Sequence, residues 1–229
     1  MAFRARRGTV SPERDLDLIA RLGDLYPAVV GDVLDRLGLR SQSMAPRIRP
    51  LTRETTLAGY AATVHCIEVD GPPVDSEDWY KGELQAVDAL EPGDVMVVST
   101  CRGCYWGELL ATASRHRGAR GIVADAYTRD TLALIEMGFP TFVAGISPED
   151  SLGRIDVDAV GVPVQCGTVG VHPGDLVIAD YDGVVVVPSA RAEEVVALAE
   201  EKVSGENLVR EKLADGMPVS EAFRTYGVI

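Results

Sequence analysis

The segment at residues 121–144 constrains the fold of this chain more than any other. An apolar run, Gly121-Ile122-Val123-Ala124, ends at the carboxylate of Asp125, and an amphipathic stretch at residues 131–137 follows. Gly138 closes that stretch, and a second apolar run occupies residues 139–144. A strand, a helix and a strand in such close succession are typical of a βαβ unit, in which both strands are parallel. We therefore expect an α/β fold.

The rest of the chain adds strands and helices to this unit. Asp182-Gly183 predicts a hairpin turn between two of the strands. No shift in composition marks a linker, so we predict one domain over residues 1–229, with a mixed sheet and N-terminal helices. Residues 1–10 are expected to form a flexible arm and residues 190–229 a helical C-terminal arm. Further strands are expected at residues 57–69, 95–98, 157–164, 176–179 and 184–187, and further helices at residues 29–37, 80–90 and 107–117.

Charge and cysteine content exclude several classes of function. The chain has 22 Lys and Arg against 35 Asp and Glu, a net charge of −13, which argues against the basic face that nucleic-acid binding needs. No window reaches the roughly 18 apolar residues of a membrane span, and no apolar run follows the basic N-terminus as in a secretory signal. Four cysteines do not make a disulfide scaffold, so we expect reduced thiols in a cytoplasmic protein. A small anionic substrate is still possible despite the negative net charge, because one Arg or a metal ion can make the electrostatic potential positive at the binding site.

The strongest candidate site is the Arg129-Asp130 pair that follows the predicted strand. Ligands of α/β proteins collect at the carboxyl ends of strands, and a helix N-terminus adds backbone donors. Arg129 is suited to grip a carboxylate, and Asp130 is suited to hold a hard divalent cation. The alternative is that Asp130 only caps the helix while Arg129 pairs with a surface carboxylate.

A second candidate is Gly107-Glu108-Leu109-Leu110. A glycine that opens a helix lets a ligand approach the free backbone N–H groups closely. The alternative is an ordinary helix start, with Glu108 favourable near the positive end of the helix dipole.

The cysteines Cys101 and Cys104 have C-x-x-C spacing. A structural zinc site needs about four ligands, and no second pair accompanies them. A redox motif of the thioredoxin type would open a helix, whereas the helix here is expected to begin later, near Gly107. Structural or incidental thiols are the favoured interpretation, and a thiol redox or metal-sensing module is the alternative.

Four segments, at residues 92–95, 107–110, 121–130 and 173–188, resemble the RraA-like family. That family contains 4-hydroxy-4-methyl-2-oxoglutarate aldolase and the regulator of ribonuclease activity A. The segments lie in the family's order, and Gly107 precedes Arg129 by the 22 residues that the family shows. The likeness extends from about Leu25 to Gly216.

The resemblance implies a swivelling β/β/α fold, assembled as a homotrimer or homohexamer, and a catalytic role for Arg129, Asp130 and Glu206. Gly107, Glu108, Leu109 and Leu110 would bind the substrate through the backbone, and Arg129 would bind its pyruvyl carboxylate. Asp130 would hold Mg²⁺ or Mn²⁺, and Glu206 matches a glutamate that a neighbouring subunit contributes from its C-terminal helix.

The implied function is that of a divalent-metal-dependent class II aldolase and decarboxylase. It would cleave a 4-carboxy-2-oxo acid, 4-hydroxy-4-methyl-2-oxoglutarate or oxaloacetate, and release pyruvate through a metal-stabilised enolate. A non-catalytic, protein-binding regulator of the ribonuclease-inhibitor type is the alternative.

The sequence departs from the family pattern near the site. Ala126 stands where the family has glycine after the aspartate, so a different turn is expected there. Tyr105, Trp106 and Tyr127 are expected to narrow the pocket.

Overall fold

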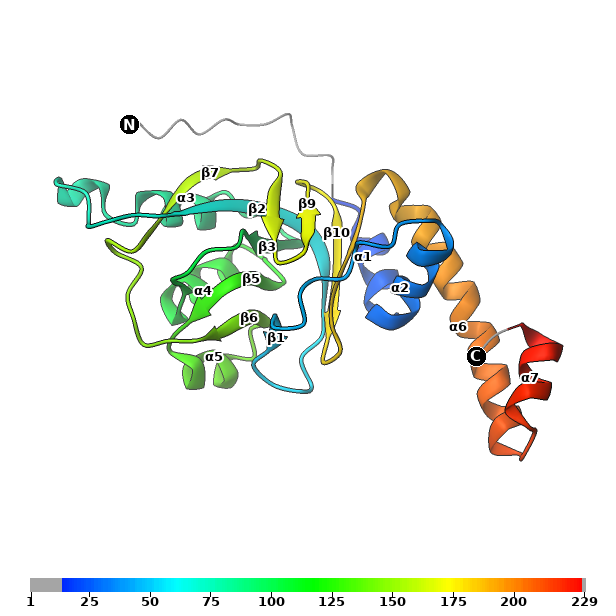
Figure 1. Cartoon of the computed structure of the whole chain (residues 1–229). Helices are drawn as coiled ribbons and strands as arrows, with labels where there is room; N and C mark the ends of the chain where they lie inside the picture. The colour runs from blue at the N-terminus through cyan, green and yellow to red at the C-terminus, as the bar shows by residue number, and fades with distance from the viewer. Residues whose placement is uncertain (1–13, 228–229) are drawn as a thin grey trace.

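The computed structural model describes residues 14–227, so the arm predicted at residues 1–10 lies outside the described part. A mixed sheet forms the centre of the molecule (Figure 1). Its strands run in the order β1 (Arg49–Pro50), β6 (Thr141–Ile146), β5 (Gly121–Thr128), β3 (Asp94–Val98), β2 (Leu57–Glu68), β10 (Leu176–Asp180) and β11 (Gly183–Val187). Two more strands extend it, β4 (Cys104–Trp106) beside β5 and β7 (Ile155–Val160) beside β2.

The predicted βαβ unit is confirmed. Strands β5 and β6 are parallel, with Ile122 opposite Thr141, and helix α5 (Thr131–Met137) connects them. The predicted hairpin is also present, because β10 and β11 are antiparallel and Asp180 pairs with Gly183 across the turn. The predicted α/β fold class, with a mixed sheet, N-terminal helices and a C-terminal helical arm, is therefore confirmed.

The sheet curls until its two ends nearly meet. Ser43, just before β1, forms a bridge with Val185 of β11, and Arg49 of β1 donates from Nη1 to the carbonyl oxygen of Asp182 at 2.5 Å. A separate hairpin of β8 (Val164–Cys166) and β9 (Val169–Val171) packs into the interior of this curl. The interior is filled by branched side chains such as Val97 and Val186.

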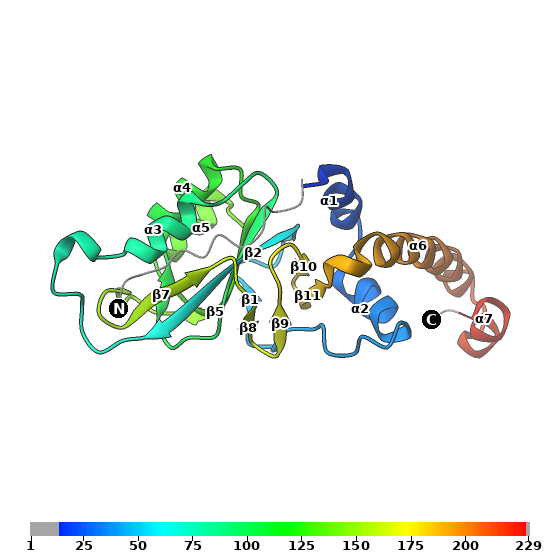
Figure 2. The same cartoon turned by 90° about the horizontal axis from the view of Figure 1, so that it is seen from above.

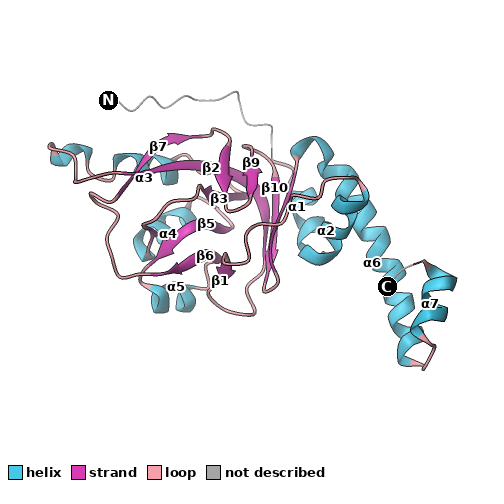
Figure 3. Ribbon diagram, in the orientation of Figure 1, coloured by secondary structure: helices cyan, strands magenta, loops and turns pink. Residues whose placement is uncertain are grey.

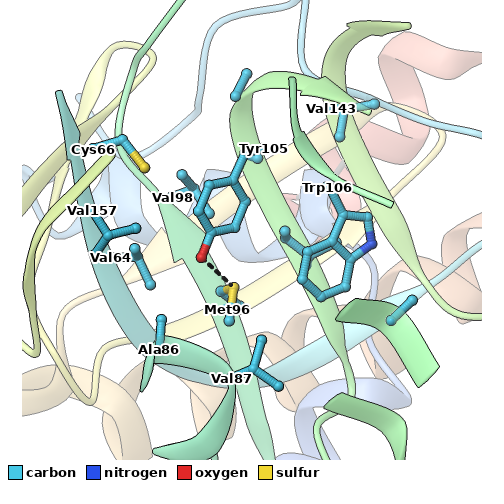
Figure 4. Close-up of a cluster of buried hydrophobic side chains, with 14 of the residues drawn as sticks. Val64, Cys66, Ala86, Val87, Met96, Val98, Tyr105, Trp106, Val143 and Val157 are labelled. Atoms are coloured by element: carbon cyan, nitrogen blue, oxygen red, sulfur yellow. Dashed lines mark hydrogen bonds between the residues drawn. The ribbon is translucent and has the colours of Figure 1, made fainter. Parts of the chain in front are cut away.

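The apolar run of strand β3 is continuous because both faces of the strand are covered. Val95 and Val97 point into the interior of the curl, whereas Met96 and Val98 point into a second cluster on the opposite face. A strand covered on both faces needs apolar residues at every position. In the second cluster Tyr105 donates its hydroxyl to the sulfur of Met96 at 3.5 Å, beside Trp106 (Figure 4).

Helices cover the sheet in two groups, which Figures 2 and 3 separate clearly. Helices α3 (Lys81–Asp88), α4 (Glu108–His116) and α5 lie along the part formed by β3, β5 and β6, with a short 3-10 turn, Ser76–Asp78, before α3. Helices α1 (Leu16–Gly23), α2 (Pro27–Arg36) and α6 (Ala192–Ala214) pack against β2, β10 and β11, with a second 3-10 turn, Ser189–Arg191, before α6. Helix α6 then continues away from the sheet and carries α7 (Val219–Tyr226) at its end. No helix within residues 14–227 has the length and apolar character needed to cross a membrane.

The structure differs from the sequence prediction at two places. Strand β5 does not end at Asp125 but continues to Thr128, so Ala126 is a buried strand residue and no turn occurs there. The sequence also predicted no strand at residues 104–106, which form β4 with their apolar side chains buried.

Candidate active site

The candidate residues meet because β4 and β5 are parallel and end together. Trp106, the last residue of β4, pairs with Thr128, the last residue of β5. The backbone N–H of Arg129 donates to the carbonyl oxygen of Trp106 at 2.9 Å. Gly107 and the Arg129-Asp130 pair, 22 residues apart in the sequence, are therefore neighbours at the carboxyl ends of two strands.

Gly107 leaves space for the carboxylate of Asp130. A Cβ atom at position 107 would lie 2.8 Å from Oδ2 of Asp130 and 3.4 Å from Cγ of Arg129. The backbone at Gly107 is extended, with φ −156°, so any residue could adopt its conformation. The glycine is therefore required by the close approach of Asp130, not by the backbone angle.

Asp130 does not act as a conventional helix cap. It occupies the N-cap position of α5, but its side chain makes no capping hydrogen bond to that helix. Instead Oδ2 accepts from the backbone N–H of Glu108 at 3.2 Å, at the start of α4. The side chain is 48% exposed, so its remaining oxygen can be reached from solvent. The structure thus disfavours the alternative in which Asp130 only caps α5.

Arg129 is oriented by the loop that follows β6. Its Nη1 lies 3.0 Å from Oδ1 of Asp150 and donates to the carbonyl oxygen of Glu149 at 3.4 Å. The other oxygen of Asp150 accepts from the hydroxyl of Tyr80 at 2.5 Å. Nε lies 3.9 Å from Oδ2 of Asp130, beyond hydrogen-bond distance, so the guanidinium keeps donors that can bind a ligand carboxylate.

A cavity of about 310 Å³ opens beside this group of residues. Trp106 and Tyr105 form a buried aromatic wall, and Leu109 and Leu110 add apolar surface. The expected narrowing by Tyr105 and Trp106 therefore agrees with the structure, whereas Tyr127 packs against Gly145 and does not line the cavity. The lining residues within the described part of the chain are Tyr80, Glu83, Leu84, Cys104, Tyr105, Trp106, Gly107, Leu109, Leu110, Arg129, Asp130, Asp150 and Ser151.

The cavity contains residues that sequence reasoning missed: Tyr80, Glu83, Asp150 and Ser151. Tyr80 and Asp130 are the two non-glycine residues with positive φ, 57° and 55°, within the described part of the chain. Such conformations concentrate at functional sites because the surrounding structure must hold them. No motif in the sequence marks Tyr80 or Asp150, since both enter the site from other elements.

Glu83 is a buried carboxyl group in the wall of the cavity. It lies in the first turn of α3 and is 5% exposed. Burial raises the pKa of Glu83 to about 7, while the Ser151 hydroxyl and the Arg129 guanidinium partly oppose that rise. The carboxylates of Asp150 and Asp156 raise it further.

The first turn of α4 presents backbone donors and one more carboxylate. The N–H groups at the start of a helix have no partner within the helix, and Leu109 and Leu110, in the first turn of α4, line the cavity. Glu108 accepts from the Thr112 hydroxyl at 2.7 Å and lines an open groove together with Asp130.

Glu206 lies elsewhere in the molecule. It is in α6, where it accepts from the Tyr26 hydroxyl and from Lys202 Nζ, the latter at 2.5 Å. Partial burial raises the pKa of Glu206, but Lys202 and Tyr26 outweigh that effect and hold it below the usual value. Glu206 does not line the cavity of its own chain, so a role in a neighbouring subunit's site stays a prediction.

The residues at the site fit a hard divalent cation. Such ions take oxygen ligands, and Mg²⁺ often keeps several waters while it binds through one or two carboxylates. Asp130 supplies one half-exposed carboxylate, and the absence of a side chain at Gly107 leaves space beside its Oδ2. No cluster of three or more Asp, Glu, His or Cys suited to a metal occurs in residues 14–227, so a cage made entirely of protein ligands is not present there.

The cysteines Cys66, Cys101, Cys104 and Cys166 are free and buried. Burial raises the pKa of Cys104 to about 11, which keeps this thiol protonated near neutral pH. A protonated, buried thiol is a poor nucleophile and a poor metal ligand.

Comparison with known proteins agrees with the resemblance seen in the sequence. A family model described as RraA-like, Aldolase/RraA, matches residues 27–186. The chain belongs to the RraA-like family. The match includes Gly107, Arg129 and Asp130 and ends before Glu206.

Similar proteins in this family carry names of two kinds. A protein of Halalkalibacterium halodurans, named "Putative 4-hydroxy-4-methyl-2-oxoglutarate aldolase", is 27% identical over 214 residues, which cover 92% of this chain and 95% of that protein. The solved structure of Streptomyces coelicolor RraAS2, described as an unusual member of the RNase ES inhibitor RraA protein family, is 30% identical with a TM-score of 0.77. That match covers 86% of this chain and 98% of the other.

A second similar solved structure is that of an uncharacterized protein from Pseudomonas syringae pv. tomato. It is 26% identical with a TM-score of 0.78 and covers 91% of this chain and 97% of its own. The RraA-like family therefore includes proteins named as aldolases and proteins named as ribonuclease inhibitors.

Proposed function

We propose that this chain is a divalent-metal-dependent carbon–carbon lyase. It cleaves 4-carboxy-2-oxo acids such as 4-hydroxy-4-methyl-2-oxoglutarate, decarboxylates oxaloacetate, and releases pyruvate from both. The observation that carries the proposal is the meeting of Gly107, Arg129 and Asp130 at the ends of β4 and β5, beside a cavity of about 310 Å³. Membership of a family with named aldolases supports the class of reaction.

Arg129 binds and orients the carboxylate of the 2-oxo acid. Asp150 and the carbonyl oxygen of Glu149 hold its guanidinium at the cavity before substrate arrives. A group held in place beforehand loses little conformational freedom on binding, and the orientation of the substrate lowers the barrier to reaction. The free N–H groups of Leu109 and Leu110 add donors at the same end of the cavity.

Asp130 would hold the cation, Mg²⁺ or Mn²⁺, with water completing the coordination. The chemistry that a divalent cation supplies at this site is stabilisation of the negative charge that develops on the 2-oxo oxygen when the C3–C4 bond breaks. Trp106 and Tyr105 keep one wall of the cavity dry, which strengthens the electrostatic interactions within it.

Pyruvate release tests the proposal directly. Purified protein is given oxaloacetate or 4-hydroxy-4-methyl-2-oxoglutarate with Mg²⁺, with Mn²⁺ or with a chelator, and pyruvate is followed through a coupled dehydrogenase. Release that needs the metal and is abolished by Asp130→Ala is the expected result. Asp35→Ala, which removes an exposed carboxylate from α2, is the control and should leave the rate unchanged.

Full activity of Asp130→Ala would contradict the assignment of the site. Absence of pyruvate from both substrates with either metal would contradict the proposed function as a whole.

A non-catalytic regulator is the second candidate, and the likeness to the RNase ES inhibitor family favours it together with the net charge of −13. An acidic surface can meet a basic partner. Capture of a ribonuclease or helicase at low salt, equally by the wild type and by Asp130→Ala, would support this function. Failure to capture either would exclude it.

A further inference from the structure

The proposed aldol cleavage needs a group that the residues assigned so far do not provide. When the C3–C4 bond of a 4-hydroxy-2-oxo acid breaks, the C4 hydroxyl becomes a carbonyl and must lose its proton. A base within reach of that hydroxyl accelerates such a step by about 10²–10⁴-fold. Arg129 and Asp130 lie at the end of the cavity that would hold the carboxylate and the 2-oxo group, so the base must come from another part of the wall.

Among the titratable groups in the cavity wall, all but one are unsuited to act as this base. Both oxygens of Asp150 are engaged, by Arg129 and by Tyr80. The pKa of Tyr80 is raised by its hydrogen bond to Asp150, and burial raises the pKa of Tyr105 well above its usual value. Both hydroxyls are therefore protonated near neutral pH and cannot act as bases.

Cys104 is excluded on the same ground. Burial raises the pKa of its thiol to about 11. Glu83 is the remaining carboxyl group among the described lining residues that neither holds the cation nor orients Arg129.

Glu83 is held firmly at this place. Its neighbour Gly82 allows α3 to pack directly on β7, because a Cβ at position 82 would lie 2.6 Å from Cβ of Val157. A catalytic group on a rigid element keeps its orientation better than one on a loop. Burial at 5% exposure also limits competition from bulk water.

We propose that Glu83 is the general base of aldol cleavage and takes the proton from the C4 hydroxyl of the bound 2-oxo acid. The C4–O bond becomes a carbonyl, the C3–C4 bond breaks, and its electron pair moves to C3 and the 2-oxo oxygen as the pyruvate enolate. Water then protonates C3, and Glu83 returns its proton to water, so protons and electrons balance. The inference rests on the proposed function and adds a residue to it.

The electrostatic surroundings of Glu83 suit this step. Asp150 from the loop after β6 and Asp156 from β7 raise the pKa of Glu83, and Arg129 at the start of α5 lowers it. Cys66 of β2 and Tyr105 of β4 face it as neutral groups. With a pKa of about 7, the carboxylate is substantially populated at neutral pH and remains a stronger base than an exposed glutamate.

The two reactions proposed for the site provide the test, because decarboxylation of oxaloacetate passes through the same enolate but has no C4 hydroxyl to deprotonate. Glu83→Gln should lower kcat for cleavage of 4-hydroxy-4-methyl-2-oxoglutarate by about 10²-fold or more. Decarboxylation of oxaloacetate by the same variant should change by no more than a few fold. Glu77→Gln, the same substitution at an exposed position just before α3, is the control.

The pH dependence supplies a second readout. In the wild type, kcat for aldol cleavage should rise through an inflection near pH 7, and this inflection should be absent from Glu83→Gln. Glu83→Asp, which keeps a carboxyl group but moves it, should be slower than the wild type and retain an inflection. A group that only supported the fold would not produce this pattern.

Three outcomes would overturn the inference. Glu83→Gln could cleave the aldol substrate as fast as the wild type, or it could lose both reactions to the same extent. Wild-type protein that decarboxylates oxaloacetate but cleaves no 4-hydroxy-2-oxo acid would overturn the inference and leave the proposed pyruvate chemistry standing. Wild-type protein that releases no pyruvate from either substrate would instead overturn the proposed function.

Discussion

At the scale of single residues, the candidate site depends on the missing side chain of Gly107 and on the carboxyl groups of Asp130 and Glu83. Gly107 has no side chain where Asp130 needs room, and Asp130 adopts φ 55° so that its carboxylate turns toward the start of α4. Glu83 is a carboxyl group placed where its charged form is poorly solvated. Each of these features predicts the effect of a small substitution.

Gly107→Ala should impair the site with little effect on the fold. The added Cβ would lie 2.8 Å from Oδ2 of Asp130 and displace that carboxylate, whereas the extended backbone accepts alanine. We expect kcat/KM for pyruvate release to fall by roughly 10- to 100-fold, because such misplacement costs about that much. The metal concentration for half-maximal activity should rise.

Gly170→Ala is the matched control for this substitution. Its Cβ would meet only Oε1 of Gln165, at 3.8 Å, so activity should not change. Equal metal dependence in Gly107→Ala and the wild type would contradict the proposed role of the gap at position 107.

The titration of Glu83 should make the free energy of unfolding depend on pH. Its pKa is raised from the usual 4.5 to about 7, so the folded state binds a proton more tightly than the unfolded state does. The proton bound to Glu83 therefore stabilises the folded state fully below pH 4.5, and this contribution is lost as pH rises through 7. The loss lowers the free energy of unfolding by up to roughly 3 kcal/mol.

Urea denaturation of the wild type and Glu83→Gln at pH 5 and pH 9 measures this contribution. Glutamine stays neutral, so the variant should gain stability relative to the wild type at the higher pH. A difference between the two proteins that is the same at both pH values would contradict the raised pKa.

At the scale of secondary-structure elements, two contacts build the cavity. The parallel pairing of β4 with β5 brings Gly107 to Asp130, and the packing of α3 on β7 brings Glu83 into the opposite wall. The second contact depends on Gly82, whose missing side chain lets the helix approach the strand closely.

Gly82→Ala should therefore displace α3. The added Cβ would lie 2.6 Å from Cβ and 2.7 Å from the carbonyl oxygen of Val157, and a backbone atom cannot move aside cheaply. We expect a loss of about 1–3 kcal/mol in the free energy of unfolding, together with slower aldol cleavage.

Gly31→Ala, in α2, is the control, because no atom lies within 4 Å of the Cβ that it adds. That substitution should stabilise the protein by up to about 1 kcal/mol through helix propensity alone. Thermal or urea unfolding of both variants tests the difference, and equal stability of the two would contradict the packing argument.

At the scale of the whole molecule, α6 extends away from the sheet (Figures 1 and 2), and Glu206 of this helix does not line the cavity of its own chain. Lys202 and Tyr26 hold this residue as a carboxylate. We propose that it completes the site of a neighbouring subunit in a homotrimer or homohexamer, as the family resemblance implies.

Mixing two inactive variants tests this proposal. Arg129→Ala and Glu206→Ala should each be nearly inactive alone, but oligomers assembled from both should contain some sites with neither defect. Recovery of part of the wild-type activity after co-refolding or co-expression is expected, and light scattering gives the oligomeric state. No recovery from mixed oligomers would place Glu206 outside a shared site.

Local sequence patterns were enough to predict the βαβ unit, the hairpin at Asp182-Gly183 and the helix start at Gly107, because each depends on residues close together in the chain. They also marked Arg129 and Asp130, which directly precede a helix. They failed for β4, since three apolar residues after a C-x-x-C spacing carry no periodicity, and for the end of β5 at Thr128.

The sequence by itself thus determined the class of fold, and it marked Gly107, Arg129 and Asp130 as candidates that the structure brings together. Only the tertiary structure decided that Tyr80, Glu83 and Asp150 form the other walls. These residues come from segments that are distant in the chain and meet in the folded molecule, and the raised pKa of Glu83 follows from its burial there. Local propensity acts over a few residues, whereas a cavity is made by side chains that are distant in the chain, and their proximity is a property of the folded molecule alone.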